Sequence, residues 1–150
     1  MSQDIYIDGK ELTSIGVYMG DGFLDALLTP PTLKEFAQND ARTKDGVQLL
    51  FTPPKVAARE VTLPFIVCGD TPLERAHNMS NFLKLLRNIP IGLYAPKVSS
   101  DECYWLAYTG KSVTFSIDLS RTVSKFSGRF NEYNPTYRTL PTWAEEIKAR

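Results

Sequence analysis

The stretch "EVTLPFIVCGDTPLERAHNMSNFLKLL", residues 60–86, begins with the pattern of a β-strand and ends with the pattern of a helix. Its first half alternates apolar residues with other residues, a period of two that predicts a strand with one face in the core. The strand should end at Gly69. Pro64 has no N–H group to donate, so we expect it at a sheet edge, at a bulge or beside a gap in the ladder. The inward-facing residues are Val61, Leu63, Phe65 and Val67.

The second half of the stretch carries the signals of a helix start. Thr71 can cap the helix, Pro72 suits the first helical position, and Glu74 stands three residues after Thr71, as in a capping box. Apolar residues then recur at spacings of three and four, and Pro90 stops the run. The sequence therefore predicts one main helix over about 72–88. Its apolar stripe is Leu73, Ala76, Met79, Phe82, Leu83 and Leu86.

Strand patterns occupy most of the remaining chain. Ile5 and Ile7 alternate with polar neighbours before a turn at Asp8-Gly9, and further strands are expected at 15–19, 47–51, 91–96, 103–110, 112–120 and 122–133. The segment 24–42 contains two prolines and leaves its structure open. Short links favour antiparallel pairing. We therefore predict an α+β fold, either an antiparallel β-sandwich or a strongly curved sheet, with one main helix.

The length of 150 residues favours a single domain, 1–150. Its C-terminal part, 134–150, should be a tail or a short helix at 143–149, capped by Thr142 with Glu145. Lys plus Arg and Asp plus Glu both number 17, which argues against nucleic acid as a partner and is compatible with self-association. The start has no signal-peptide pattern, and no apolar run approaches bilayer length. We expect a soluble protein made in a reducing cytoplasm, with Cys68 and Cys103 as two buried thiols.

The sequence offers no recognisable catalytic, cofactor-binding or metal-binding motif. His77 is the only histidine and lies within the predicted helix, where a polar surface role is the simpler interpretation. The adjacent acids at 101–102 and 145–146 point apart in any regular element. We therefore predict no enzyme, no cofactor and no metal, and an enzyme with an unusual acid–base pair is the least favoured alternative. A second alternative is a small β-sandwich module that binds a peptide or carbohydrate through Tyr104, Trp105 and Tyr108.

The order of these signals resembles that of one family. "IYIDGKEL" at 5–12 leads to Ile15–Val17, then to Asp45-Gly46, and then to a strand of Arg59, Val61, Leu63, Phe65, Val67 and Gly69. A helix with "NFLKLL" at 81–86 follows, and then "CYWLAYTG" and "SVTFSIDL". In this order the chain resembles, over about 4–131, the ring-forming N-terminal domain of bacteriophage distal tail proteins and the related tail-tube fold. Larger members of the family carry a second, C-terminal sandwich domain.

The resemblance implies a structural component of a phage or prophage tail, made in the bacterial host cytoplasm and located in the virion tail. Its copies would form a homo-oligomer, a hexameric ring around the channel, and would contact other tail proteins of the tube, baseplate or tail tip. No nucleic-acid specificity and no membrane anchor are expected. Loops are the usual place of such contacts, so the candidates are the region 24–45 and the loop 52–59. The individual interaction candidates are Pro53, Pro54, Lys55, Arg59, Tyr104 and Trp105.

Overall fold

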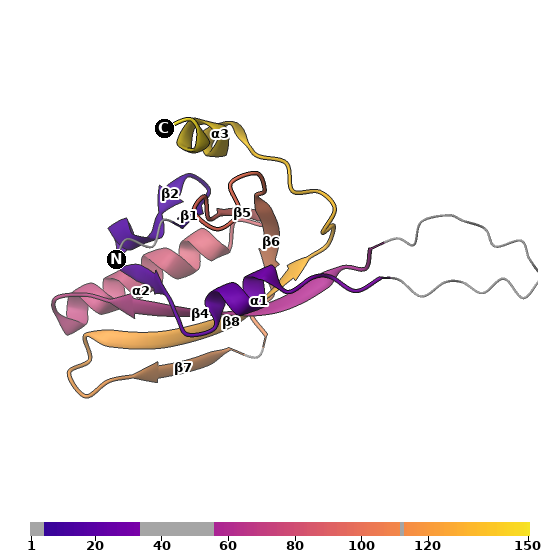
Figure 1. Ribbon diagram of the computed structural model, residues 1–150. Coiled ribbons are helices and arrows are strands. Elements are labelled where there is room, and N and C mark those ends of the chain that lie inside the picture. Colours follow the sequence, from indigo (N-terminus) through magenta and orange to yellow (C-terminus); the bar gives the residue numbers. More distant parts are fainter. Residues whose placement is uncertain (1–4, 34–55, 112) are drawn as a thin grey trace, which may run out of the picture.

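A computed structural model describes residues 5–33, 56–111 and 113–150. Within these residues the chain forms one strongly curled, half-barrel sheet of eight strands, with helices packed against it (Figure 1). The strand order is β2-β1-β5-β6-β8-β4-β3, with β7 also paired to β8, and each neighbouring pair is antiparallel. The α+β prediction is confirmed, and of its two forms the curved sheet is the one observed. The predicted strand at 47–51 lies outside the described residues.

The element bounds follow the sequence patterns closely. The strands are β1 Tyr6–Ile7, β2 Lys10–Glu11, β3 Val17–Met19, β4 Arg59–Cys68, β5 Ile91–Tyr94, β6 Tyr104–Tyr108, β7 Thr114–Ile117 and β8 Val123–Glu132. The helices are the 3-10 helix η1 Leu12–Ile15, and α1 Phe23–Leu28, α2 Pro72–Leu86 and α3 Thr142–Lys148. The predicted turn between β1 and β2 is present, with positive φ at both Asp8 (51°) and Gly9 (87°).

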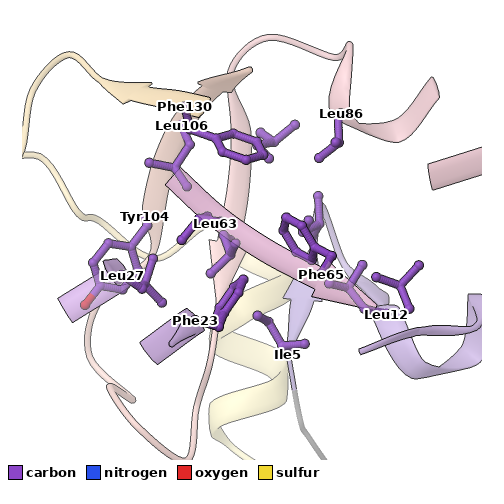
Figure 2. Packing of buried hydrophobic residues seen from close by; sticks show 14 of the residues in the cluster. Ile5, Leu12, Phe23, Leu27, Leu63, Phe65, Leu86, Tyr104, Leu106 and Phe130 are labelled. Atoms are coloured by element: carbon purple, nitrogen blue, oxygen red, sulfur yellow. The ribbon is translucent and has the colours of Figure 1, made fainter. Parts of the chain in front are cut away.

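The centre of the sheet is the pair β4 and β8, ten residues each, matched along their whole length. The predicted inward face of β4 is buried, and Phe65 lies at its middle with 1% exposure. Figure 2 shows how the core gathers around Phe65. Burial of each such side chain contributes about 1.5–3 kcal/mol, so this aromatic cluster holds helices and sheet together. The Phe65 ring contacts the rings of Phe23, Phe82, Phe126 and Phe130, at centroid distances of 5.2, 4.8, 6.4 and 6.2 Å.

Pro64 lies beside a gap in the ladder, as its missing donor requires. Strand β3 ends at Met19, opposite Phe65, so Pro64 is one position beyond the end of β3. The Pro64 carbonyl faces this side and accepts a hydrogen bond from the Gly20 N–H at 2.9 Å. In an antiparallel strand the N and O atoms of one residue face the same edge. The absent N–H of Pro64 therefore costs no ladder hydrogen bond.

Helix α2 begins where the capping signals predict and ends at Leu86, two residues before the expected end. The Thr71 Oγ1 accepts a hydrogen bond from the Glu74 N–H at 3.1 Å, and Glu74 in turn accepts one from the Asp70 N–H at 3.2 Å. The predicted apolar stripe is only partly buried. Leu73 is 81% exposed, whereas Leu86 is fully buried. The C-terminal half of α2 therefore packs on the core, and its first turn faces outward.

Helix α1 lies in the region whose structure the sequence left open. Phe23 and Leu27 are four residues apart, hence on one face of the helix, and both are buried. This face packs on β4, where Phe23 meets Phe65. Helix α1 is six residues long, and Pro30 and Pro31 follow it. Tertiary packing rather than intrinsic propensity therefore holds it in place.

Helix α3 confirms the predicted terminal helix but not its cap. Thr142 is the first helical residue, Pro141 occupies the cap position, and no side chain caps the helix there. The helix buries Ala144 against Tyr94 and Cys103, in a second cluster apart from the main core. Cys103 is buried as predicted, whereas Cys68, at the end of β4, is partly exposed, so the expectation of two buried thiols is wrong for Cys68. No helix in the described parts of the chain has the length and hydropathy to cross a bilayer.

Candidate functional site

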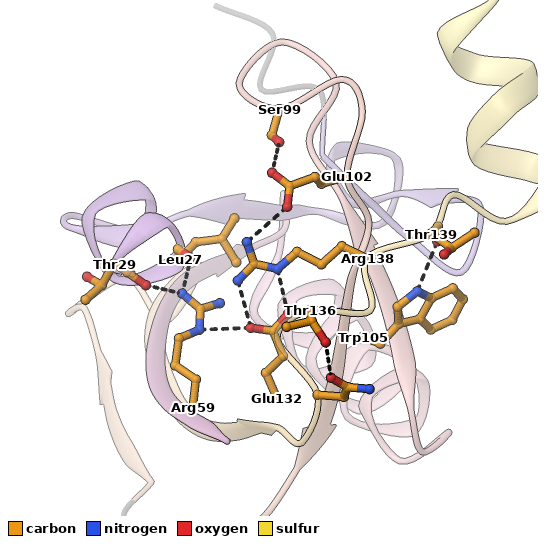
Figure 3. A network of polar contacts seen from close by, with 11 residues as sticks. Leu27, Thr29, Arg59, Ser99, Glu102, Trp105, Glu132, Thr136, Arg138 and Thr139 are labelled. Carbon is orange, nitrogen blue, oxygen red and sulfur yellow. Dashed lines mark hydrogen bonds and ion pairs between the residues drawn. The ribbon is translucent and has the colours of Figure 1, made fainter. Parts of the chain in front are cut away.

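A buried ion pair joins the ends of the two central strands. Arg59 begins β4, Glu132 ends β8, and the two residues are direct cross-strand partners. Arg59 is 7% exposed and Glu132 is fully buried, with Nε of Arg59 3.0 Å from Oε1 of Glu132 (Figure 3). Both residues continue the inward-facing, period-two line of their strands. That continuation is the sequence signal that could have identified Glu132, which the sequence analysis did not select.

Arg138, in the C-terminal segment 134–150, is the second positive group that faces the negative charge of Glu132. Its Nε and Nη2 donate to the two carboxylate oxygens of Glu132, each at 3.0 Å, and its Nη1 donates to Glu102 at 3.1 Å. The guanidinium also lies 4.6 Å from the ring centroid of Tyr104. Burial lowers the pKa of Arg138, but the hydrogen bonds to Glu132 and Glu102 outweigh that effect, and its pKa lies above the ordinary value. The group therefore stays charged and holds the C-terminal segment on the sheet.

Arg59 also closes the end of helix α1. Its Nη1 donates to the carbonyl oxygens of Leu27 and Thr29, at 2.6 Å each. These carbonyls belong to the last turn of a helix, where backbone acceptors have no helical partner and a positive charge is favourable. Among the described residues, Nη2 of Arg59 has no hydrogen-bond partner although it is buried. The guanidinium thus connects α1, β4 and β8 at one point.

The same point lies next to the base of the segment 34–55. Thr32 accepts a hydrogen bond from the Ala57 N–H at 2.8 Å, and Leu33 forms an antiparallel bridge with Val56. Both short stretches lie close to Arg59. Arg59 follows Ala57 by two residues, and its Nη1 donates to the carbonyl of Thr29, three residues before Thr32. The ion pair network therefore fixes where the chain departs from the sheet and where it returns.

The predicted loop candidates fall on both sides of the described boundary. Pro53, Pro54 and Lys55 lie outside the described residues, and a role for them in contacts stays a prediction. Arg59 is described, and the structure places its side chain inside the protein, in the network above. A role for Arg59 in contacts with other proteins stays a prediction; its contacts in the structure are with Glu132, Leu27 and Thr29.

The three aromatic residues of β6 do not form one surface. Tyr104 is 2% exposed in the main core, and Tyr108 packs on Phe130 with ring centroids 5.3 Å apart. Trp105 faces the other side of the strand, where its Nε1 donates to the Thr139 carbonyl at 3.1 Å. The C-terminal segment thus lies against Trp105, and Tyr104 and Tyr108 belong to the packing of the core.

The other acids and the histidine are placed apart from one another. Asp101 pairs with Lys148 at 2.5 Å, and Glu102 pairs with Arg138. His77 is exposed on α2. Across residues 5–33, 56–111 and 113–150, no three His, Cys, Asp or Glu side chains gather as a metal-binding group would. The described ionisable groups named here serve ion pairs and the surface.

Strand β7 presents an apolar surface that the other described residues leave uncovered. Within the described part of the chain it pairs with β8 alone, and all four of its residues are exposed. Strand alternation places Phe115 (51% exposed) and Ile117 (42%) on one side of β7, and Leu119 (103%) follows in the turn of the hairpin. An edge strand offers unpaired backbone groups, and a native protein usually protects such an edge or uses it. The opposite end of this part of the sheet is β3, also an edge strand.

A shallow trough of about 410 Å³ runs over the sheet between these two edges. Its lining includes Asp21 from the turn after β3, Lys125 from β8 and the hydroxyls of Thr114 and Ser127, which are hydrogen-bonded to each other. A single carboxylate and a single ammonium group do not make an acid–base pair of tuned pKa. The edges on either side of the trough, rather than the trough, are therefore the candidate functional site.

The comparisons with known proteins agree with this view of the fold. No family model matches the sequence, and no curated protein matches it. Among solved structures, the chain is similar to the Dit (gp 19.1) protein of SPP1, whose structure is described as a paradigm of the hub adsorption apparatus in phages that infect Gram-positive bacteria. The TM-score is 0.53 and the identity 20%, over 88% of this chain. The chain spans 50% of the Dit chain, its N-terminal half. In fold, this protein is therefore similar to the N-terminal half of a phage distal tail hub protein, as the order of its sequence signals predicts.

Proposed function

We propose that this chain is a non-catalytic structural subunit of a phage or prophage tail, whose copies close into a hexameric ring around the tail channel. The observation that carries the proposal is the uncovered apolar edge strand β7 on a sheet that is curled but not closed. Closing a ring from such sheets covers edges that otherwise invite uncontrolled pairing. The likeness in fold to the Dit hub protein supports the same assignment.

The use of charged side chains supports a structural role. Arg59, Arg138 and Glu132 are buried together and hydrogen-bonded into the scaffold. A catalytic acid or base needs a pKa adjusted to its task and access to a substrate. The Glu132 carboxylate lies between two guanidinium groups and is closed off from solvent, so this cluster serves rigidity.

The partners in this proposal are other copies of the chain and neighbouring tail proteins of the tube, baseplate or tail tip, in the virion tail. The loop 52–59, with Pro53, Pro54 and Lys55, is proposed to reach such a neighbour. The SPP1 protein is described as a hub adsorption apparatus, and this chain spans half of that protein. We therefore propose a role for this chain in the ring and none in the attachment of receptor-binding proteins.

The experiment is a measurement of mass in solution over a wide range of concentration, followed by negative-stain images of the largest species. Light scattering should show a concentration-dependent step from the 16.9 kDa monomer to a single closed oligomer, and the images should show rings with an open centre. A chain that stays monomeric at the highest concentration, alone and mixed with its tube protein, would sink the proposal. Open filaments would retain self-assembly but exclude a closed ring.

A further inference from the structure

The two free edges at the β7 and β3 ends of the sheet carry opposite charge. From Leu12 to Leu33, which includes β3 and α1, the sequence has Asp21 and Asp25 and no Lys or Arg. From Lys111 to Lys125, which includes β7, its turn and the start of β8, there are three basic residues and one acid, Asp118. Lys125 itself lies on β8 beside the edge strand, opposite Ser116 of β7, and lines the trough between the two edges. The pKa of Asp118 is lowered by hydrogen bonds from Ser120 and from backbone N–H groups of its own turn. Its charge is thus engaged locally, and the β7 edge is basic.

The charges on both edges are placed to meet a partner. Asp21, Asp25, Lys111 and Lys125 are exposed, and none of the four forms an ion pair with another described residue. The basic edge also has the exposed apolar side of β7, and the acidic edge has Tyr18 (36% exposed) and Leu28 (43%). The strands themselves are of similar length, three residues in β3 and four in β7. Charge, apolar surface and strand length are therefore complementary between the two edges.

We infer that the β7 edge of one copy docks on the β3–α1 edge of a second copy, with Lys111 and Lys125 facing Asp21 and Asp25. This inference rests on the proposed ring and names the two surfaces that build it. Because the surfaces differ, the contact is head-to-tail: each copy uses one edge in a contact and keeps its other edge free for the next copy. The charges would fix which edges meet and would speed the encounter, while the apolar side of β7 supplies the contact area.

Charge reversal tests the pairing of the edges. The variant Asp21→Lys/Asp25→Lys has two basic edges, and the variant Lys111→Glu/Lys125→Glu has two acidic edges. Each alone should associate about tenfold or more weakly than the parent at about 0.1 M salt, where charges act over about 10 Å. A one-to-one mixture should assemble again, since each variant supplies the edge that the other needs. Sedimentation velocity measures the association, and circular dichroism checks that every variant is folded.

The matched control is Lys10→Glu/Lys84→Glu, which changes the net charge by the same amount as Lys111→Glu/Lys125→Glu. Lys10 and Lys84 line a different hollow, between β2 and α2. It should associate like the parent. If the parent assembles and both edge variants assemble equally well, the inference fails while the proposed ring stands. The inference also fails if both edge variants weaken assembly and their mixture does not restore it. If the parent does not assemble at all, both the ring and the inference are wrong.

Discussion

The carboxylate of Glu132 is fully buried and lies between the guanidinium groups of Arg59 and Arg138. Desolvation of a lone charge costs several kcal/mol, so a buried carboxylate survives only when its partners are placed well. Here the two oxygens receive hydrogen bonds from Arg138 and an ionic contact from Arg59. The same two arginines hold the C-terminal segment and the end of α1. Loss of the one negative charge therefore leaves two buried positive groups facing each other.

We predict that Glu132→Gln destabilises the protein by about 3–5 kcal/mol, the usual effect of removing one member of a buried ion pair. The matched control is Glu60→Gln, which removes the exposed partner of Arg129 (3.5 Å) in the same strand pair and should cost less than about 1 kcal/mol. Urea unfolding followed by fluorescence measures both. Equal, small effects of the two substitutions would contradict the role given to Glu132.

Cys103 is the second residue with a defined prediction. Burial, followed by the charge of Asp8, raises the pKa of the Cys103 thiol to about 12. Because the thiolate is the reactive form, iodoacetamide at neutral pH should label the partly exposed Cys68 and spare Cys103 until denaturant is added. Intact mass before and after unfolding counts the adducts. Two adducts on the folded chain would show that Cys103 is accessible.

The same raised pKa gives a direction for stability at high pH. The thiol ionises near its ordinary value of 9.0 in the unfolded chain and near 12 in the folded one. The stabilisation from the neutral buried thiol is thus complete below about pH 9 and declines as the pH rises toward 12. Cys103→Ala should make the loss of stability across this window less steep. A slope identical to that of the parent would mean that Cys103 does not contribute.

At the scale of elements, local patterns predicted β4 and α2 well because their signals are contained in the segments themselves. Thr71 caps through its own hydroxyl, and Val61 to Val67 alternate because one face is buried. Helix α1 could not be predicted, since Phe23 and Leu27 gain their stability from Phe65, which is distant in sequence. The exposure of β7 was also beyond prediction. A period of two shows that Phe115 and Ile117 share a face and says nothing about whether another element covers it.

At the candidate site, too, local patterns predict part of the structure and contacts distant in sequence decide the rest. The resemblance predicted the fold, whereas the network of Glu132 and Arg138 depends on contacts between β8, β4 and the C-terminal segment. The proline-rich stretch predicts Arg59 in a loop, yet the inward-facing line of β4 extends to it and places it in the interior. The aromatic rings of Tyr104 and Trp105 suggest one binding surface, but neighbouring residues of a strand point to opposite faces.

A substitution in β7 separates the stability of the chain from its assembly. Phe115 is half exposed, so Phe115→Thr, which replaces an aromatic strand former with a β-branched one, should change the free energy of unfolding of the monomer by about 1 kcal/mol or less. Association between copies should nevertheless weaken clearly. Phe65→Ala, in the core, should instead cost about 3–5 kcal/mol. Urea titration and sedimentation give the two quantities, and unchanged association of Phe115→Thr would remove β7 from the interface.

At the scale of the whole molecule, the described residues form a half-barrel whose edge strands are β2, β3 and β7, and the β3 and β7 edges differ from each other. The β7 edge is basic and apolar, the β3–α1 edge is acidic, and β8 and β4 lie between them. Docking of the β7 edge on the β3–α1 edge is head-to-tail, and it closes into a ring when the rotation between copies is right. The network around Glu132 connects β4, β8, α1 and Arg138 at one end of the two central strands.

The most direct measurement is cross-linking between the two edges in assembled protein. A Cys68→Ser chain that carries both Tyr18→Cys on β3 and Ser116→Cys on β7 is treated with a short bismaleimide. Within one copy, β8 and β4 lie between the two cysteines, which are three strand spacings apart, about 14 Å, so a short reagent joins cysteines of different copies. The account predicts a ladder of covalent oligomers that ends at the hexamer, and only dimers from an equal mixture of the two single-cysteine chains. Monomer alone, under conditions where light scattering shows assembly, would contradict it.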